Sequence, residues 1–183
     1  MGLSCSLAAV TLLLVGSSAT AIGQAAPGQG PPPVRASFAL LDTTGGHIGQ
    51  VTAIQQPGGV LLQIMATGLA EGRHGIHLHA ASACEPPAFS SAGGHLNPEG
   101  KQHGRHNSAG PHLGDLPNLV VDEQGEGRAA LLLDGVTLTA GPRSIGVPGT
   151  ALVIHASEDD ELTDPAGHAG GRIACAAISV SSN

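Results

Sequence analysis

Aromatic and basic side chains are nearly absent from this 183-residue chain. It has no tryptophan, no tyrosine and only two phenylalanines, and its 7 Lys+Arg against 14 Asp+Glu give a formal net charge of −7. Binding of single-stranded nucleic acid relies on aromatic stacking in a basic groove, and duplex binding relies on neutralising phosphates with Lys and Arg. The composition therefore argues against nucleic acid as a partner.

A sustained helical period is also missing, and no internal repeat is visible. Turn-forming residues are abundant instead, with 28 Gly and 13 Pro, and 41% of the residues are hydrophobic. Short apolar runs separated by turn residues predict strands at hairpin-like spacing. There are eight such runs, at residues 34–41, 47–56, 60–69, 75–79, 118–122, 128–138, 151–156 and 172–180. We expect an all-β domain over 34–183, an eight-stranded antiparallel barrel or sandwich.

The first 21 residues have the pattern of a signal peptide. An apolar core at residues 7–15 is followed by small residues that end in Ala19-Thr20-Ala21, an A-x-A cleavage pattern. The apolar stretch falls short of the roughly 20 residues that span a membrane. No Lys or Arg precedes Arg35, so the usual basic start of a leader is absent. The sequence predicts export to a periplasmic or extracellular location, followed by a Pro/Gly-rich linker over 22–33.

Cleavage of this leader would remove one of the three cysteines, Cys5. The remaining pair, Cys84 and Cys175, would lie in a compartment where disulfides persist. A bridge between them and two buried free thiols are both compatible with the sequence. Lipidation of Cys5 would instead tether the protein to a membrane, and the sequence leaves this alternative open.

Two long stretches contain no strand pattern, residues 85–117 and 157–171. Loops of this length in a compact domain are usually functional or disordered. Histidines and cysteines lie in or next to both, which favours function.

Histidine is the unusual residue of this composition, because ten histidines outnumber the seven basic residues. His77 and His79 lie two apart in a predicted strand, so both imidazoles face the same side and can reach one metal ion. His155, in another strand, could supply a third nitrogen. The long loop adds His95, His103, His112 and Asp115, and three imidazoles with one carboxylate form a closed set suited to structural zinc.

These motifs resemble the copper/zinc superoxide dismutases, especially the exported bacterial members. The resemblance covers residues 34–182, and its blocks occur in family order: HGIHLH, SAGGHLNP, KQHG, GPHLGDLPN, ALVIHASEDD and GHAGGRIAC. It implies a Greek-key β-barrel and dismutation of superoxide to oxygen and hydrogen peroxide, by copper cycling between Cu(II) and Cu(I).

The resemblance also implies a role for each matching residue. Copper would be held by His77, His79, His95 and His155, and zinc by His95, His103, His112 and Asp115, so that a His95 imidazolate bridges the two metals. Cys84 and Cys175 would form the family's disulfide. Arg172 would attract the superoxide anion, and Asp159 would link a copper-ligand imidazole to a zinc-ligand imidazole. His74 is interpreted as a structural histidine, and His47, His106 and His168 as solvated ones.

The resulting hypothesis is a secreted antioxidant enzyme with one copper and one zinc per subunit. Monomer and homodimer both remain open, because no interface motif stands out. Two other classes remain as alternatives: a binding protein that buffers copper and zinc without turnover, and a structural domain with a degenerate site.

Overall fold

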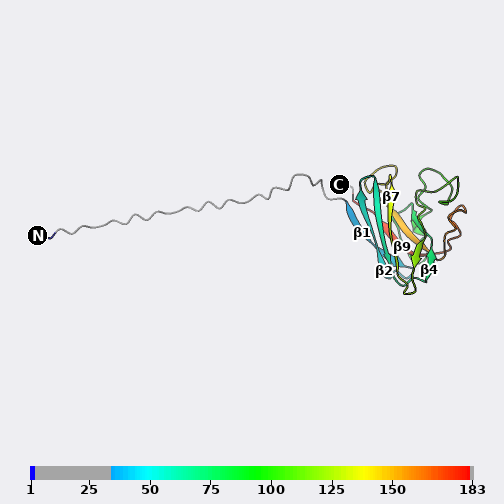
Figure 1. The fold of residues 1–183 in the computed structure, drawn as a ribbon, viewed down its shortest axis with the longest axis horizontal. Coiled ribbons are helices and arrows are strands. Elements are labelled where there is room, and N and C mark those ends of the chain that lie inside the picture. The colour runs from blue at the N-terminus through cyan, green and yellow to red at the C-terminus, as the bar shows by residue number, and fades with distance from the viewer. Residues whose placement is uncertain (3–33, 182–183) are drawn as a thin grey trace. The chain divides into compact units, whose positions relative to one another are not determined.

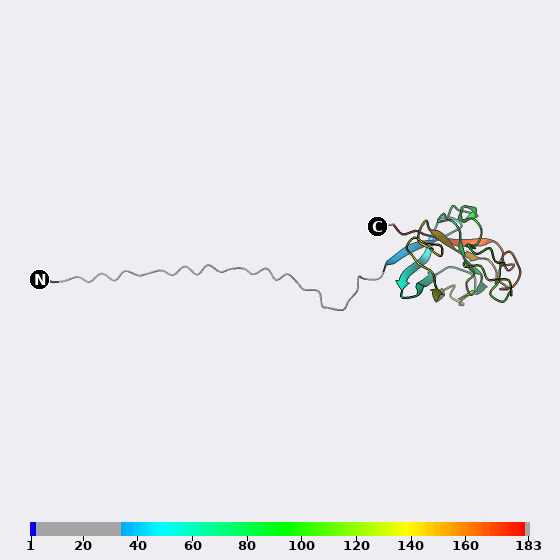
Figure 2. The same ribbon diagram turned by 90° about the horizontal axis from the view of Figure 1, so that it is seen from above.

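The computed structural model describes residues 1–2 and 34–181, and the strands of this second range form a barrel (Figures 1 and 2). The predicted signal peptide and linker therefore lie outside the described residues, apart from the first two positions. Within the described residues, no helix is both long and apolar enough to cross a membrane.

Nine strands lie within residues 34–181, one more than the sequence predicts. They are β1 (Arg35–Asp42), β2 (His47–Gln56), β3 (Gly59–Ala66), β4 (Gly72–His74), β5 (Ile76–His79), β6 (Leu119–Val121), β7 (Gly127–Asp134), β8 (Thr150–His155) and β9 (Arg172–Ile178). The extra strand is β4, which pairs with β6 through His74 and Leu119. The predicted eight-strand count was wrong because the three residues Gly-Arg-His have no apolar alternation to signal a strand.

The strands form one antiparallel sheet in the order β4-β6-β7-β3-β2-β1-β9-β8-β5. Its two edge strands, β4 and β5, follow one another in the chain with only Gly75 between them, so the sheet curls into a nearly closed barrel. The neighbours β3 and β7, β1 and β9, and β5 and β8 are not consecutive, as Greek-key crossovers require. The predicted all-β, antiparallel Greek-key class is confirmed.

Alternation along the strands directs one set of side chains into the barrel. In β3, Val60, Leu62 and Ile64 are buried inside, whereas Gln63 and Met65 face out. In β5 the core receives Ile76 and Leu78, so His77 and His79 lie on the opposite face, outside the barrel. All six residues of β8 are nonetheless buried, because other parts of the chain cover its outer face.

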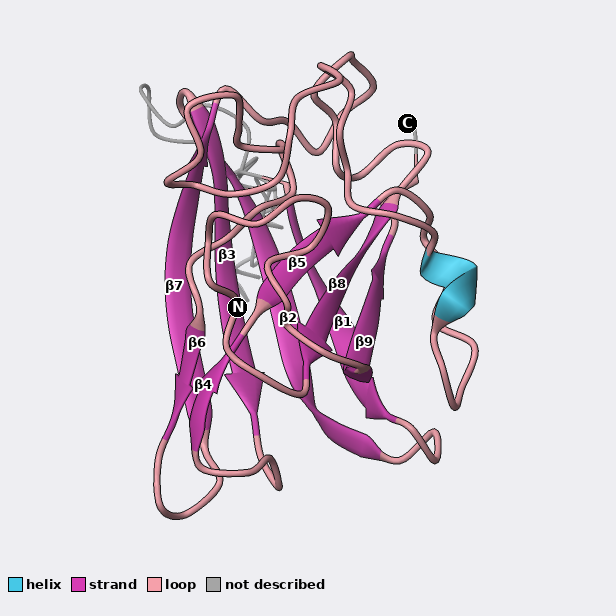
Figure 3. Cartoon of the chain, turned by 90° about the vertical axis from the view of Figure 1, so that its right-hand side faces the viewer, coloured by secondary structure: helices cyan, strands magenta, loops and turns pink. Residues whose placement is uncertain are grey.

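The two long predicted loops supply this cover. Residues 80–118 contain one short 3-10 turn, η1 (Ser90–Ala92), drawn in cyan in Figure 3, and no strand. Isolated bridges join His77 to Asp115 and His79 to His95, so the first loop folds back onto β5. The second loop, residues 156–171, follows β8 directly.

A disulfide between Cys84 and Cys175 ties the first loop to β9, with a Cα–Cα distance of 5.7 Å. Of the two alternatives left open for these cysteines, the bridge is therefore the one present. Since Cys175 lies opposite Val153 of β8, the disulfide holds the start of the loop against the β8–β9 pair.

Candidate metal centre

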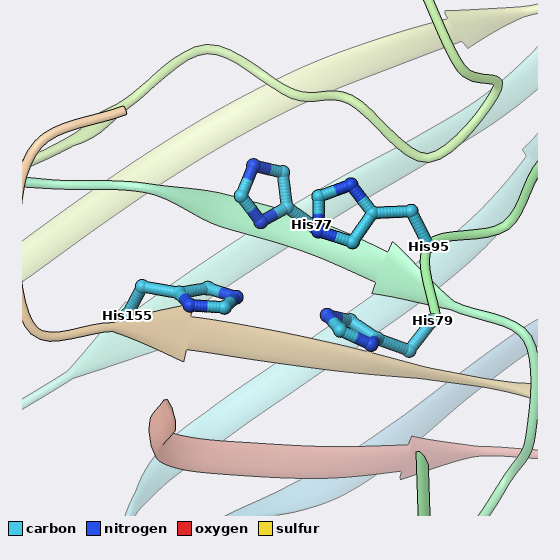
Figure 4. Close-up of side chains that lie close together, drawn as sticks. All are labelled: His77, His79, His95 and His155. Carbon is cyan, nitrogen blue, oxygen red and sulfur yellow. The ribbon is translucent and has the colours of Figure 1, made fainter. Parts of the chain in front are cut away.

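Four histidine side chains converge on the outer face of β5 and β8. His77 and His79 come from β5, His155 from the end of β8, and His95 from the first loop (Figure 4). One ring nitrogen from each lies within 4.8 Å of those of the other three. The set predicted from sequence to hold copper is thus brought together by strand pairing and by the loop that folds over it.

Three of these imidazoles each leave one buried nitrogen without a partner. His77 Nε2 lies 2.6 Å from Asp159 Oδ2, while His79 Nδ1 and His155 Nδ1 lie 2.9 and 3.0 Å from the carbonyl oxygens of Gly93 and Gly170. The remaining atoms, His77 Nδ1, His79 Nε2 and His155 Nε2, have no hydrogen-bond partner in the described part of the chain. Because carbonyl and carboxylate oxygens accept, the bonded nitrogens carry the protons and the three free nitrogens carry lone pairs. An orphaned buried acceptor is costly, and a metal ion is the partner that satisfies three at once.

A second group of ligand atoms gathers around the Asp115 carboxylate. Asp115 Oδ1 lies 3.0 Å from His103 Nδ1 and 3.2 Å from the Nδ1 atoms of His95 and His112. A tetrahedral zinc site with ligands at about 2.0–2.1 Å places its donor atoms roughly 3.3 Å apart, so these separations suit a shared ion. The other oxygen, Oδ2, accepts the backbone N–H groups of Gly104 and His112, each at 2.9 Å, which holds Oδ1 toward the histidines.

Asp159 joins the two groups. Its Oδ2 contacts His77 Nε2 at 2.6 Å and its Oδ1 contacts His103 Nε2 at 3.0 Å, so one carboxylate orients one ring of each set. Gly167, at φ +61°, permits this approach, since a Cβ at that position would overlap the Asp159 carboxylate. Burial alone would raise the pKa of Asp159, but its hydrogen bonds to His103 and His77 outweigh burial and lower it.

Burial lowers the pKa of His77, His79 and His155 and so favours their neutral form. It lowers the pKa of His79 to about 3 and that of His155 to about 4, against partial compensation from the carbonyls of Gly93 and Gly170. Neutral imidazole is the form that binds a metal. In the second group, burial also lowers the pKa of His103, but hydrogen bonds to Asp115 and Asp159 outweigh it and raise the pKa to about 9.

The metal-free protein is expected to lose stability on mild acidification. In the unfolded chain, His79 and His155 titrate near pH 6.5, so below that pH the unfolded state binds up to two protons that the folded state does not. Each contributes a slope of at most about 1.4 kcal/mol per pH unit, and less near pH 6, where the unfolded imidazoles are not yet fully protonated. Together they predict a fall of about 2 kcal/mol in the free energy of unfolding between pH 6 and pH 5. His103 is protonated in the folded state, and it opposes this fall only slightly because the unfolded imidazole is already mostly protonated below pH 6.

Denaturant unfolding of the metal-free protein at several pH values between 5 and 7 measures this slope. A free energy of unfolding that stays level or rises toward pH 5 would contradict the neutral state of the two histidines. Metal-loaded protein serves as the comparison, since bound metal keeps the same nitrogens deprotonated.

Arg172, the first residue of β9, reaches the cavity beside the first histidine group. This cavity has a volume of about 710 Å³, and its lining includes His79, His95, His155 and Arg172. The guanidinium donates two hydrogen bonds of 2.6 Å, from Nη1 to the carbonyl of Phe89 and from Nη2 to the carbonyl of Gly93. A fixed positive charge therefore lies in the same cavity as His79 and His155, two of the three imidazoles with an unpartnered nitrogen.

The remaining histidines lie where the sequence predicts. His74 is buried, with Nδ1 2.7 Å from the His155 carbonyl and Nε2 2.9 Å from that of Ala70, so it is a structural histidine. His47, His106 and His168 are exposed. Sequence reasoning missed the carbonyl acceptors of Phe89, Gly93 and Gly170, because a backbone carbonyl carries no residue-specific signal.

The barrel and its site together define a class of protein. An antiparallel Greek-key barrel carries, on its outer face, a four-histidine group and a group of three histidines around Asp115 that both include His95, beside a fixed arginine. This is the architecture of a metalloprotein with two adjacent metal sites. Comparison with known proteins identifies the family: residues 47–178 match the family described as Copper/zinc superoxide dismutase (SODC), and the chain belongs to it.

Individual relatives support the same family assignment. "Superoxide dismutase [Cu-Zn] 2" of Aquifex aeolicus is 44% identical over 148 residues, which cover 79% of this chain and 86% of that protein. "Superoxide dismutase [Cu-Zn]" of Deinococcus radiodurans is 39% identical over 184 residues, covering 92% and 94%. The crystal structure of a SOD-like protein from Bacillus subtilis superposes with a TM-score of 0.74 at 34% identity, covering 78% of this chain and 97% of that one. The chain is accordingly an oxidoreductase that uses copper and zinc and acts on superoxide.

Proposed function

We propose that this chain dismutes superoxide at copper held by His77, His79, His95 and His155, beside zinc held by His95, His103, His112 and Asp115, and that it does so after export. The observation that carries the proposal is the set of three unpartnered, buried imidazole nitrogens of His77, His79 and His155. Two of these histidines, His79 and His155, line one cavity together with Arg172.

The donor chemistry supports copper in the first group. Neutral imidazole nitrogens suit copper in both of its oxidation states, and the cavity beside them leaves room for a small anion. His95 belongs to this group while its Nδ1 faces Asp115, so its Nε2 is the nitrogen available here.

A second set of four residues could hold the zinc ion, because a ring nitrogen of His77 also lies within 4.8 Å of the ligand atoms of His95, His103 and Asp115. We choose His112 instead, since its Nδ1 lies 3.2 Å from Asp115 Oδ1 and 3.4 Å from His95 Nδ1. Both nitrogens of His77 have other roles: Nε2 contacts Asp159, and Nδ1 belongs to the first group. Three imidazoles and a carboxylate form a closed structural zinc site, which would hold the long loop in place.

The bound copper supplies one-electron chemistry, in which one superoxide is oxidised to oxygen and a second is reduced and, with two protons, becomes hydrogen peroxide. The side chains of the protein attract the substrate, hold a proton and orient the metal ligands. Arg172 attracts the anion into the cavity and holds it near the histidine group, a local attraction that opposes the net charge of −7. His95 Nε2 can hold a proton at the point where peroxide forms. Asp159 keeps His77 and His103 in the tautomers and orientations that ligation needs.

Metal content and superoxide disappearance, measured together, test this proposal. We expect about one copper and one zinc per chain, as the two ligand sets require, and activity that is lost when copper is chelated and returns when it is restored. Bound metal without turnover would make the chain a copper and zinc buffer and overturn the proposal. Weak binding of both metals would show a degenerate site.

The proposal includes export from the cytoplasm. It is supported by the Cys84–Cys175 disulfide, which is typical of oxidising compartments, and by the leader pattern of residues 1–21. N-terminal sequencing of the mature protein from cell fractions tests it, with a start near Ile22 expected. An intact Met1 in a cytoplasmic fraction would contradict export. The sedimentation of that mature form would also distinguish a monomer from a homodimer.

A further inference from the structure

Phe89 combines two features that rarely occur together. Its side chain is completely buried, yet its backbone adopts a left-handed conformation with φ +51° and ψ +27°. Bulky residues seldom take a positive φ, and such positions persist only where surrounding contacts hold them. The residue directly precedes the η1 turn, whose first and last backbone hydrogen bonds run from Ala92 N–H to the Phe89 carbonyl and from Gly93 N–H to the Ser90 carbonyl.

The turn presents two carbonyl oxygens to the site. The Phe89 carbonyl accepts from Arg172 Nη1 and the Gly93 carbonyl accepts from Arg172 Nη2, both at 2.6 Å. The Gly93 carbonyl also accepts from His79 Nδ1 at 2.9 Å. One short turn therefore sets both the position of the arginine and the tautomer of a histidine in the first group.

The Phe89 ring is the largest side chain of a small apolar cluster separate from the barrel core. It packs with Ala92, with Ala151 and Val153 of the outer face of β8, and with Cys175, with Cys84 at the edge. Within this cluster, Phe89 and Ala92 of the first loop cover Ala151 and Val153 on the outer face of β8. The same cluster thus links the disulfide, β8 and the turn.

We propose that Phe89 is a positioning residue for Arg172. Burial of its ring against β8 and the disulfide holds the backbone at positive φ, and that conformation aims the Phe89 and Gly93 carbonyls at the guanidinium. The charge in the cavity thereby keeps a fixed place relative to His79, instead of moving with a long, flexible side chain. The inference rests on the proposed function, because a fixed cation matters only where an anion must be brought to the histidine group.

The first test measures the accessibility of Arg172 in the metal-free protein, so it does not depend on dismutase activity. Phenylglyoxal modifies arginines, and peptide mass spectrometry gives the rate at Arg172 relative to the exposed Arg128 of the same chain. For Phe89→Ala we expect this ratio to rise about tenfold, the equivalent of losing one charge-assisted hydrogen bond. Phe89→Leu, which keeps an apolar anchor, is expected to stay within about twofold of the wild type.

The other phenylalanine provides a matched control. Phe38 packs against the barrel core and is not a member of the Phe89 cluster, so Phe38→Ala removes the same side-chain volume and is expected to lower stability without moving Arg172. If Phe89→Ala does not fold, Phe89→Val replaces it, because a β-branched residue disfavours positive φ. An unchanged ratio in the folded Phe89 variant, or an equal rise in Phe38→Ala, would overturn the inference.

The second test uses the copper- and zinc-loaded protein at matched copper content. Phe89→Ala is expected to lower the dismutation rate about tenfold at low ionic strength and to weaken the decline of that rate with added salt, because the cation is no longer held at the cavity. A wild-type protein without activity would refute the proposed function but leave the phenylglyoxal result to decide on Phe89. A slower variant with an unchanged salt dependence would show a structural role alone and overturn the positioning role.

Discussion

Replacing His95 with alanine is expected to weaken both metal sites at once and to lower dismutase activity by at least about a hundredfold. The bound is conservative, because losing a group that merely orients a ligand already costs 10–100-fold in affinity or activity. His95 is the one imidazole that belongs to the four-histidine group and also lies 3.2 Å from Asp115 Oδ1. Without His95, each of the two metal sites keeps three of its four ligands.

Two single-site variants serve as matched controls. His155→Ala removes a ligand from the first group only, and His112→Ala from the second only, so each should reduce chiefly one metal in a copper and zinc analysis. His155→Ala should still abolish activity, since copper carries the chemistry. If His95→Ala keeps both metals at full content, the shared-ligand assignment is wrong.

Removal of the disulfide is the second change with a large expected effect. Cys84 and Cys175 are separated by 91 positions, and the chain-entropy account allows a stabilisation of about 4 to 5 kcal/mol for a closed loop of that size. This is a large part of the 5–15 kcal/mol typical of a folded domain. The Cys84→Ala/Cys175→Ala variant should therefore show a much lower free energy of unfolding by denaturant titration.

Loss of the disulfide should also alter the metal centre. Cys175 packs in the cluster that contains Phe89, and the Phe89 carbonyl holds Arg172, so activity at equal copper content should fall together with stability. Reduction of the wild-type protein by dithiothreitol provides a second route to the same state. A change in unfolding free energy below about 1 kcal/mol would show that loop closure contributes little here.

Much of the fold could be predicted from the order of apolar runs. The strand β2 has the predicted bounds, and the others differ by a few residues at their ends, where turn residues compete with pairing. The predicted run 128–138 ends early, at Asp134, because Gly135 turns the chain at φ +66°. The strand β4 could not be predicted, since pairing with β6 rather than its own residues makes it a strand.

The sequence by itself determined which side chains can bind metal. Alternation in β5 places His77 and His79 on one face, and the loop histidines with Asp115 have the chemistry of a zinc site. These are properties of residue type and local period, which do not depend on the rest of the chain. The resemblance to a family rests on the same residues.

Only the tertiary structure decided how those side chains are held. Backbone carbonyls of Gly93 and Gly170 select which nitrogen of His79 and His155 stays free, and these acceptors lie 14 and 15 positions further along the chain, in long loops that must fold back. The left-handed conformation of Phe89, and the hydrogen bonds that the Phe89 and Gly93 carbonyls accept from Arg172, depend on burial of the Phe89 ring against β8 and the disulfide. The physical reason is that a carbonyl has the same chemistry at every residue, so its role is decided by where the folded backbone aims it.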